Sequence, residues 1–358
     1  METDSKTAKN VLVAPLNWGL GHATRCIPII KALEEDGFNP ILASDGVALE
    51  LLRKEFPHLK TLQLPSYGIS YPRSGKLLKL RLLFSAYRIM SAVKAERKLV
   101  TQWVDEYQLV GIISDNRFGI RSGRVPSVYM THQLRVFSGL STFLTTAAHQ
   151  KIIAKYDQCW IPDSSVTFTL SGKLGHVKKN IQNIKYIGAL SRFKKRELPL
   201  RYDLMILLSG PEPQREILEK KLLSELKNYS GNIIFVAGKI EAMQKIRKEI
   251  NLTYFNFMVG EELEKSLNES KLVVCRSGYT TIMDLAKLKK KAFFIPTPGQ
   301  SEQEYLAKKL SDDGIVAFST QKNFRLEDID RAEKLSGFKN FTDSTLGLTD
   351  LFSLFKRK

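Results

Sequence analysis

Short apolar segments rich in Val, Ile, Leu and Phe alternate with longer segments of helical periodicity along the whole chain. Because the short segments are apolar throughout, rather than at every second position, they indicate strands that are covered on both faces. We expect such strands at residues 11–16, 40–44, 61–64, 109–114 and 126–131 of the first half, and at 203–209, 232–237, 252–257, 271–275 and 291–296 of the second. Parallel strands need helical crossovers, so the pattern predicts two α/β domains, each a doubly wound parallel sheet between helices.

The segment between the two sets of strands is polar and basic. Residues 186–203 hold five basic residues and a proline before the next expected strand begins. We place the domain boundary there, which gives an N-terminal domain of residues 1–190 and a C-terminal domain of residues 191–358. The last helix is expected to pack back on the N-terminal domain. Doubly wound sheets bind ligands at the carboxyl ends of their strands, so we expect two Rossmann-like domains that face each other across a cleft.

The composition adds a strong positive charge to this picture. The chain has 55 Lys and Arg against 37 Asp and Glu, a net charge of +18, with 43% hydrophobic and 26% charged residues. These proportions are typical of a globular protein and exclude wholesale disorder and coiled coil. The charge favours an anionic partner: nucleic acid, an acidic membrane surface or a phosphorylated substrate.

The spacing of the cysteines, the N-terminal residues and the length of the apolar segments indicate a protein of a reducing compartment. The three cysteines are far apart and form no CxxC pair, so neither a disulfide framework nor a zinc site is expected. The N-terminal residues lack the apolar core of a signal peptide, and no segment approaches the roughly 18 apolar residues of a spanning helix. We therefore expect a cytoplasmic protein.

Much of the positive charge lies in residues 73–98, which hold eight basic residues and one acidic residue, Glu96. Apolar residues recur there at helical spacing: Leu77, Leu80, Phe84, Tyr87 and Met90. A basic amphipathic helix of this kind is typical of binding to an anionic membrane surface. The alternative is a core helix with a solvated basic face. No nucleic-acid-binding module is recognisable, so a nucleic acid partner is not expected.

The first expected strand leads directly into a glycine loop, NWGLGHATR, and then a helix. Gly19 and Gly21 allow a tight turn, and the helix N-terminus favours an anion. A dinucleotide fingerprint with Asp45 as the ribose acid is one interpretation, but Thr24 stands where that motif has its third glycine. His22 opens the helix and is a candidate general base, because its ordinary pKa lies near neutral pH. Alternatively, His22 only packs or caps the loop.

Two further polar residues follow strands of the first domain. Asp115 comes directly after the strand at 109–114, and His132 follows the strand at 126–131. Asp115 could orient His22 or act as the base itself. The alternative is that Asp115 caps a turn and His132 packs internally.

In the second domain, the strand at 271–275 is followed by an RSG turn and a helix. Arg276, Ser277 and Gly278, together with the helix N-terminus, could form a cradle for a diphosphate. Asp284 lies two turns into that helix, where it could accept hydrogen bonds from a ribose diol. Each feature alone is also compatible with an ordinary strand-to-helix turn and a solvated helix face.

Taken together, PLNWGLGHATR, YIGALSR and CRSGYTTIMDLAKLKKKAFFIPTPGQSEQEYLAKKL resemble the MurG-like, nucleotide-sugar-dependent glycosyltransferases of family 28, which have the two-domain GT-B fold. The resemblance implies that Gly19, Gly21 and His22 face the acceptor and the diphosphate, and that Arg192 approaches the donor diphosphate. It also implies that the donor is held by the turn made of Ser277, Gly278, Tyr279, Thr280 and Thr281.

Other positions match the family less closely. Asp284 stands where the family has a Glu that grips the ribose. Gln303 and Glu304 match a Gln pair that contacts the transferred sugar, and Glu304 departs from it. Ser209 and Gly210 lie where the family has a glycine-rich loop, and Gly260 lies near the backbone that reads the uracil. THQL, which contains His132, corresponds to an HEQN-like motif.

The resemblance implies inverting transfer of a hexosyl or N-acetylhexosaminyl group from a UDP-sugar to a hydroxyl of a lipid-linked or glycan acceptor. We expect an enzyme on the inner face of the cell membrane that needs no cofactor besides its UDP-sugar substrate and no metal. The only DxD pair, Asp328 and Asp330, falls in an expected surface helix. Two alternatives remain: a UDP-N-acetylglucosamine 2-epimerase, which shares the fold and donor, and a non-catalytic module that binds nucleotide sugar or membrane.

Overall fold

The computed structural model describes residues 9–68, 78–137, 142–165, 168–177, 183–239, 241–342 and 347–356; the side chains of residues 78–86 are not among those described. The chain divides into two compact units. The first contains the described residues of Met1–Ser165, Lys173–Leu190 and Ser344–Lys358, and the second those of Val166–Gly172 and Ser191–Asp343. The division after Leu190 falls in the basic segment between the two sets of strands.

The first unit is built on a seven-stranded parallel sheet of order β3-β2-β1-β4-β5-β6-β7. Its strands are β1 (Lys9–Pro15), β2 (Phe38–Ser44), β3 (Thr61–Gln63), β4 (Leu109–Asp115), β5 (Ser127–Met130), β6 (Gln158–Ile161) and β7 (Ile184–Tyr186). The helices are α1 (Gly21–Glu35), α2 (Gly46–Glu55), α3 (Leu78–Glu106) and α4 (Thr142–Ile153). All five expected strands of this half are confirmed, whereas the short strands β6 and β7 were not predicted.

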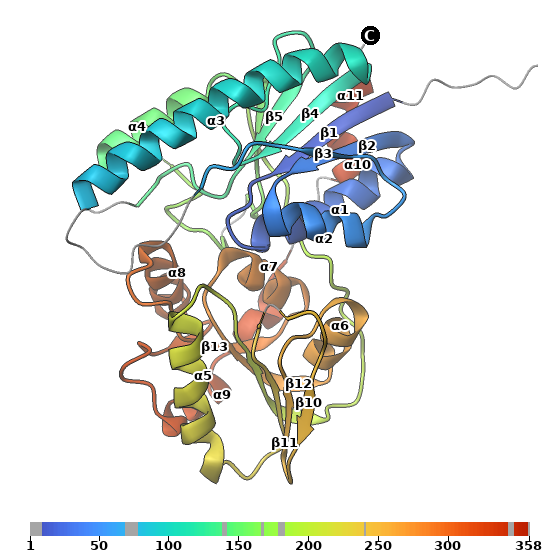
Figure 1. The fold of residues 1–358 in the computed structure, drawn as a ribbon. Helices are drawn as coiled ribbons and strands as arrows, with labels where there is room; N and C mark the ends of the chain where they lie inside the picture. The colour runs from blue at the N-terminus through green and yellow to red at the C-terminus, as the bar shows by residue number, and fades with distance from the viewer. Residues whose placement is uncertain are drawn as a thin grey trace, which may run out of the picture. The chain divides into compact units, whose positions relative to one another are not determined.

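The core of the first unit lies between the sheet and its helices. Leu12 and Ala14 of β1 and Ile41 of β2 pack against Val100 and Trp103 of α3. Figure 1 shows α3 on one side of this sheet and α1 and α2 on the other. Since both faces are covered, the central strands contain unbroken runs of buried apolar residues, as the sequence pattern indicates.

The second unit repeats this plan with a sheet of order β10-β11-β9-β8-β12-β13-β14, in which only the β10–β11 pair is antiparallel. Its strands are β8 (Tyr202–Leu207), β9 (Ile233–Val236), β10 (Ile246–Lys248), β11 (Leu252–Phe255), β12 (Ser270–Cys275), β13 (Lys291–Phe294) and β14 (Ala317–Phe318). The longer helices are α5 (Gln214–Glu225), α6 (Gly260–Asn268), α7 (Tyr279–Lys287) and α8 (Ser301–Asp312). Without β10, the strands follow the same chain order as those of the first sheet, so both units are doubly wound.

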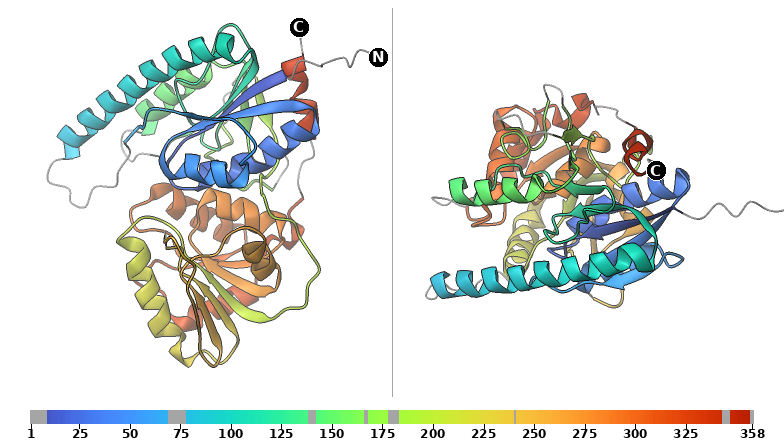
Figure 2. Two further views of the ribbon diagram at one scale, coloured as in Figure 1. Left: turned by 45° about the vertical axis from the view of Figure 1, so that its right-hand side comes forward. Right: turned by 90° about the horizontal axis from the view of Figure 1, so that it is seen from above.

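The C-terminal helices α10 (Leu348–Leu351) and α11 (Ser353–Lys356) are part of the first unit. The rings of Phe352 and Phe355 pack around Trp160 and Phe38, with centroid distances of 6.1–6.3 Å. A Cβ on Gly111 of β4 would lie 2.2 Å from the Phe355 ring, so this contact requires a glycine. Both views of Figure 2 show the red C-terminal segment beside the blue N-terminal elements.

Phe355→Ala is expected to destabilise the first unit by about 3 kcal/mol, because a fully buried ring is removed and leaves a cavity. Chemical denaturation followed by tryptophan fluorescence measures the change, since Trp160 lies against this ring. Ser353→Ala, at an exposed position of α11, is the matched control. An unchanged denaturation midpoint for Phe355→Ala would show that the C-terminal helix is not part of the folded core.

Candidate active site

Polar side chains follow three adjacent strands at one edge of the first sheet. β1 leads into α1, whose second residue is His22; β4 ends at Asp115; and His132 lies two residues beyond β5. Because β1, β4 and β5 are neighbouring parallel strands, their carboxyl ends meet at the same edge. Gly19 has a φ of 73°, and no atom lies within 4 Å of the position that a Cβ would take. The loop before α1 therefore turns at a backbone conformation in which glycine is unstrained.

At this edge the structure brings His22 and Asp115 together. The Nδ1 atom of His22 lies 3.2 Å from Oδ2 of Asp115. Asp115 is fully buried, whereas the His22 side chain is 13% exposed. No hydrogen bond to Nε2 of His22 is found within the described residues. The two predicted catalytic residues therefore form an oriented pair in which the histidine is the member that solvent can reach.

A third residue, Arg25, completes the arrangement. It is one turn after His22 on α1 and only 2% exposed. Its Nε donates to Oδ2 of Asp115 at 2.7 Å and its Nη2 pairs with Oδ1, which makes a bidentate fork. Nη1 lies 3.0 Å from Nδ1 of His132, and Nη2 lies 3.0 Å from Nδ1 of His22. Arg25 was not predicted; its signal in the sequence is a lone arginine within the apolar stretch that follows His22.

Burial and charge set the protonation of this cluster. Burial is the largest effect on the pKa of His22 and lowers it; the Asp115 carboxylate opposes this shift, and Arg25 adds to it. Burial alone would raise the pKa of Asp115, but the charge of Arg25 and the contact with His22 outweigh it and hold that pKa well below its usual value. At neutral pH the site thus contains a neutral imidazole beside an ionised carboxylate, an arrangement suited to general-base chemistry at His22.

Asp45, the acidic residue that the dinucleotide interpretation assigns to the ribose, is paired with other residues of the protein. Asp45 is 4% exposed and forms an ion pair with Arg117, which itself is fully buried. Asn17 donates to the other carboxylate oxygen of Asp45 at 3.2 Å. Arg117 also donates to Glu96 of α3 at 2.8 Å, so the three residues form a buried charge network that ties α3 to the sheet. Both carboxylates are engaged by the protein itself.

In the second unit, the predicted donor-binding residues lie in loops at the carboxyl ends of β8, β12 and β13. Ser209 and Gly210 follow β8, Gly278 caps α7 after β12, and Thr297 follows β13. A Cβ on Gly210 would lie 3.7 Å from the Thr297 hydroxyl, so the first and third loops are close together. Gly278 is the N-cap residue of α7 and has no side chain to cap the helix. A Cβ at this position would lie near only one atom, the Thr281 hydroxyl at 3.9 Å. The N-terminus of α7 therefore presents backbone N–H groups that no capping side chain of Gly278 occupies.

The prediction that Arg276 and Ser277 contact a diphosphate disagrees with the structure. The Arg276 side chain is 1% exposed and donates to the carbonyls of Ile295, Pro296 and Gln214 and to the Gln321 side chain, at 2.6–3.0 Å. Burial lowers its pKa to about 10. The Ser277 hydroxyl is buried and donates to the Gln303 carbonyl at 2.8 Å. Both side chains tie the loops together, because the turn after β12 directs them into the unit. Nε of Arg276 is buried and has no hydrogen-bond partner within the described residues.

Gln303 and Glu304 lie in the first turn of α8 and fold back on the loop before it. The Gln303 Oε1 accepts from the Thr297 N–H at 2.9 Å, and Glu304 Oε1 accepts from the Gly299 N–H at 3.0 Å. Their side chains thus fix the loop after β13, at the edge where the resemblance implies a sugar contact.

Asp284 lies on α7, where its carboxylate accepts a hydrogen bond of 2.5 Å from Ser191. Burial raises the pKa of Asp284 to about 7, against the opposing effects of Ser191 and the Arg192 charge. The structure therefore brings the two matched residues Arg192 and Asp284 into one cluster. Three of the remaining residues that match the family lie in the first turn of α7: Tyr279 is buried, and Thr280 and Thr281 are half-buried. Gly260 lies at the start of α6, where it is exposed and has a φ of 58°.

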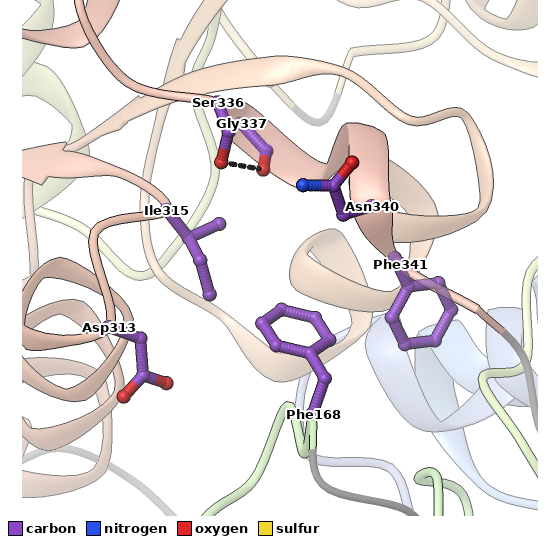
Figure 3. A pocket seen from close by; sticks show the side chains of 7 residues that line it. All are labelled: Phe168, Asp313, Ile315, Ser336, Gly337, Asn340 and Phe341. Atoms are coloured by element: carbon purple, nitrogen blue, oxygen red, sulfur yellow. Dashed lines mark hydrogen bonds between the residues drawn. The ribbon is translucent and has the colours of Figure 1, made fainter.

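A small pocket of about 170 Å³ lies elsewhere in the second unit (Figure 3). It is lined by Phe168, Asp313, Ile315, Ser336, Gly337, Asn340 and Phe341. Phe168 belongs to a segment that the expected boundary assigned to the first domain; its ring meets that of Phe341 edge-to-face at 5.8 Å. None of the predicted donor-binding residues lines this pocket.

Comparisons with known proteins agree with the fold and with the resemblance. Residues 214–336 match the glycosyltransferase family 28 C-terminal domain. A UDP-N-acetylglucosamine--N-acetylmuramyl-(pentapeptide) pyrophosphoryl-undecaprenol N-acetylglucosamine transferase of Haemophilus ducreyi is 22% identical over 86% of this chain and 84% of its own. A protein of Methanosarcina acetivorans that is named as an uncharacterized glycosyltransferase is 24% identical over 90% of this chain and 89% of its own.

Solved structures extend the likeness to the whole fold. The MurG crystal structure from Acinetobacter baumannii has a TM-score of 0.59 and 14% identity, covering 97% of this chain and 99% of that one. The glycosyltransferase SnogD from Streptomyces nogalater has a TM-score of 0.63 and 12% identity, covering 98% and 95%. These likenesses, the matched family domain and the two doubly wound units agree: the chain is a MurG-like glycosyltransferase with the GT-B fold.

Proposed function

We propose that the protein transfers a hexosyl or N-acetylhexosaminyl group from a UDP-sugar to a hydroxyl of a lipid-linked or glycan acceptor, with inversion and without a metal ion. The observation that carries the proposal is the His22–Asp115 pair, in which a buried carboxylate orients a partly exposed, neutral imidazole. The name of the Haemophilus ducreyi relative supports the donor and acceptor classes, since it contains UDP-N-acetylglucosamine and a pyrophosphoryl-undecaprenol acceptor.

In the proposed reaction Nε2 of His22 takes the proton of the acceptor hydroxyl. The hydroxyl oxygen attacks the anomeric carbon, a new C–O bond forms, and the bond to the UDP oxygen breaks with its electron pair leaving on UDP. Asp115 keeps the proton of the resulting imidazolium on Nδ1 by hydrogen bonding. Asp115 is a poor candidate for the base itself, because its pKa is held low and Arg25 occupies both of its oxygens.

The leaving diphosphate is proposed to bind at the N-terminus of α7. Gly278 has no side chain to cap the helix, so the N–H groups of the first turn and the positive end of the helix dipole suit an anion there. Arg192, whose charge already acts on Asp284 of α7, adds a cation to the same region. Fixed positive groups of this kind stabilise a departing diphosphate in the transition state.

These groups take the place that a divalent cation holds in metal-dependent transferases, which gives a direct prediction. Treatment with excess EDTA, followed by removal of the chelated metal, is expected to leave the rate of UDP release within about twofold of the untreated rate. A coupled assay for UDP measures it. Loss of activity that added Mg²⁺ or Mn²⁺ restores would contradict the metal-independent part of the proposal.

The 2-epimerase alternative needs several free acidic groups around the sugar. Its two candidates here are Asp115 and Glu304. Asp115 is locked by Arg25, and Glu304 accepts a hydrogen bond from the Gly299 N–H. The observed contacts therefore favour transfer over epimerisation.

We also propose that the first unit binds an anionic membrane surface. Residues 73–77 of the basic segment lie outside the described residues, and the rest forms the first part of α3. On α3, Tyr87 is 74% and Met90 is 66% exposed, beside the exposed basic residue Arg88. On α4, Phe143 and Leu144 are 82% and 71% exposed. Exposed apolar side chains on α3, which is basic, and on α4 favour an interfacial membrane contact over a core helix with a solvated face. No helix within the described residues has the length and apolar character needed to cross a membrane.

Charge removal tests the membrane proposal. Replacement of Lys76, Lys79, Arg81 and Arg88 by Gln is expected to weaken binding to vesicles with anionic lipid by at least about tenfold, since each basic residue near such a surface contributes about 1 kcal/mol. Vesicle sedimentation at several salt concentrations measures the binding. The matched control replaces Lys220, Lys265, Lys308 and Lys322 of the second unit, which changes the net charge equally. Equal binding of the two variants would refute the proposed surface.

The proposed reaction is tested by incubating the full chain with UDP-sugars and with or without lipid-linked acceptors. A transferase releases UDP and needs the acceptor for rapid release. An epimerase converts the sugar nucleotide without acceptor, and a binding module shows donor-dependent thermal stabilisation without turnover. Either of the last two outcomes would overturn the proposal.

A further inference from the structure

The strand β10 (Ile246–Lys248) forms one edge of the second sheet. Among the described residues it pairs with β11 alone, and it stands first in the strand order of that sheet. Every residue from 241 to 250 is exposed except for any whose placement is not described, and three of them carry large apolar side chains: Met243, Ile246 and Ile250. An edge strand offers backbone hydrogen-bonding groups to another chain, and exposed apolar side chains beside it indicate a contact surface.

The hydrogen bonds to β11 show which backbone groups of β10 face the open edge. The Asn256 N–H donates to the Lys245 carbonyl at 3.2 Å, and the Glu249 N–H donates to the Leu252 carbonyl at 2.8 Å. Bonding positions alternate along an antiparallel pair, so the odd-numbered residues of this segment bond to β11 and the even-numbered ones do not. The N–H and C=O groups of Lys248 therefore point outward, where another strand can bond to them.

The charges of this edge are complementary to themselves when two copies run antiparallel with Lys248 opposite Lys248. Arg247 then lies opposite Glu249 of the second copy, and Glu249 lies opposite Arg247. These are positions without ladder hydrogen bonds, where the side chains of neighbouring strands come closest. Within one chain, Nε of Arg247 lies 3.1 Å from Oε1 of Glu249, so the two groups already share one face of the strand.

The apolar residues favour the same register. Ile246 lies opposite Ile250 of the second copy, and the two-fold symmetry makes this contact twice. Sliding the strands by two residues in either direction keeps the outward backbone groups paired, but it separates the isoleucines and places Arg247 or Glu249 opposite itself. One pair of like charges, Lys248 with its counterpart, opposes the register in which two ion pairs and two apolar contacts form.

We propose that the second unit self-associates through β10, by antiparallel pairing with β10 of a second copy of this chain. The same edge of both copies is used around a two-fold axis at Lys248, so the contact joins two seven-stranded sheets and closes as a dimer. Basic residues often protect an edge strand from pairing, but here Glu249 supplies the opposite charge where a second copy requires it. Stable interfaces bury about 1,200–2,000 Å², so pairing through this short strand gives a weak dimer that depends on concentration.

Charge reversal tests the register. Sedimentation equilibrium of the full chain over a range of concentrations measures the association, and the unaltered protein is expected to show a monomer–dimer equilibrium. Arg247→Glu makes both charged contacts acidic on each side, and Glu249→Arg makes both basic on each side. Each variant alone is therefore expected to dimerise at least about tenfold more weakly. The double variant Arg247→Glu/Glu249→Arg is complementary to itself again and is expected to dimerise like the unaltered protein.

A mixture of the two single variants gives the sharpest test. One variant has glutamate at both positions and the other has arginine at both, so each complements the other and heterodimers are expected. Sedimentation velocity with a fluorescent label on one variant detects them. The matched control is the exposed ion pair of Glu216 and Lys220 on α5. Lys220→Glu and Glu216→Lys change the net charge in the same way and are expected to leave the association unchanged.

Proline tests the backbone part of the pairing, because it has no N–H. Lys248→Pro removes a donor that faces the open edge and leaves the bonds to β11 in place, so it is expected to abolish dimerisation while the fold is kept. Lys248→Thr removes the pair of like charges and is expected to strengthen dimerisation. Circular dichroism checks that each variant is folded. If Lys248→Pro does not fold, the charge-reversal variants still decide the question.

Two results would overturn the inference, and neither depends on the proposed function. A protein that is monomeric at every concentration up to about 1 mM does not pair through this edge with itself. A dimer that Arg247→Glu does not weaken, or that the double variant does not restore, is held together by another surface.

Discussion

Substitution of His22 by asparagine is expected to lower kcat for UDP release by about a thousandfold, the size of effect that a general base supplies. The asparagine amide can still donate to Asp115, so the local structure and the donor affinity are expected to stay close to those of the unaltered protein. What is lost is the lone pair of Nε2, which has no counterpart in the shorter side chain. Steady-state kinetics with a fixed saturating acceptor measures the change.

The pH dependence gives the same substitution a second readout. The base is active when deprotonated, and burial together with Arg25 lowers the pKa of His22. Activity of the unaltered protein is therefore expected to persist below the ordinary histidine pKa of about 6.5, and to fall only at more acidic pH. His22→Asn is expected to lose this acid limb. His58→Asn, at a histidine that is 61% exposed, is the matched control. Full activity of His22→Asn would remove His22 from the mechanism.

Substitution of Gly278 by aspartate is expected to stabilise the second unit and yet to raise the KM for the UDP-sugar at least about a hundredfold. Gly278 is the N-cap of α7, with φ −69° and ψ 138°, so a side chain is accommodated without backbone strain. An aspartate there can cap the helix, which contributes about a few tenths of a kcal/mol relative to glycine. The same carboxylate would occupy the N–H groups proposed for the diphosphate, each worth about 1.5 to 3 kcal/mol to a charged ligand.

Gly278→Ala separates the effect of charge from that of bulk, because its methyl group meets only the Thr281 hydroxyl at 3.9 Å. We expect a change in KM of less than about tenfold for alanine, since it leaves the N–H groups accessible. Thermal denaturation and donor titration on the same samples give both quantities. A stabilised Gly278→Asp variant with unchanged KM would show that the diphosphate does not bind at α7.

The sequence allowed the fold to be predicted where burial decides the pattern. Strands covered on both faces, such as β1 and β12, contain an unbroken run of buried apolar residues and were found with bounds close to those observed. The antiparallel edge strand β10 is exposed along its whole length, so no apolar run marks it. The strands β7 and β14 are two or three residues long, and such short segments cannot be distinguished from loops by periodicity.

The candidate site was predictable to the extent that it depends on strand ends. His22 and Asp115 each follow a strand of the same parallel sheet, and this topology brings them to one edge. The direction of a side chain after a strand cannot be read in the same way. Arg276 also follows a strand, but its guanidinium turns inward to backbone carbonyls. Arg25 was missed because a helix interior normally excludes charge, and its partner Asp115 is 90 residues away in the sequence.

The configuration of the product tests the central claim most directly. If an acceptor hydroxyl deprotonated by His22 attacks the anomeric carbon in a single displacement, an α-linked UDP-sugar gives a β-linked product. The glycosylated acceptor, purified after reaction with the full chain, can be examined by NMR for the coupling constant of its anomeric proton. A β-linked product is the predicted result. An α-linked product would contradict direct attack and, with it, the role assigned to His22.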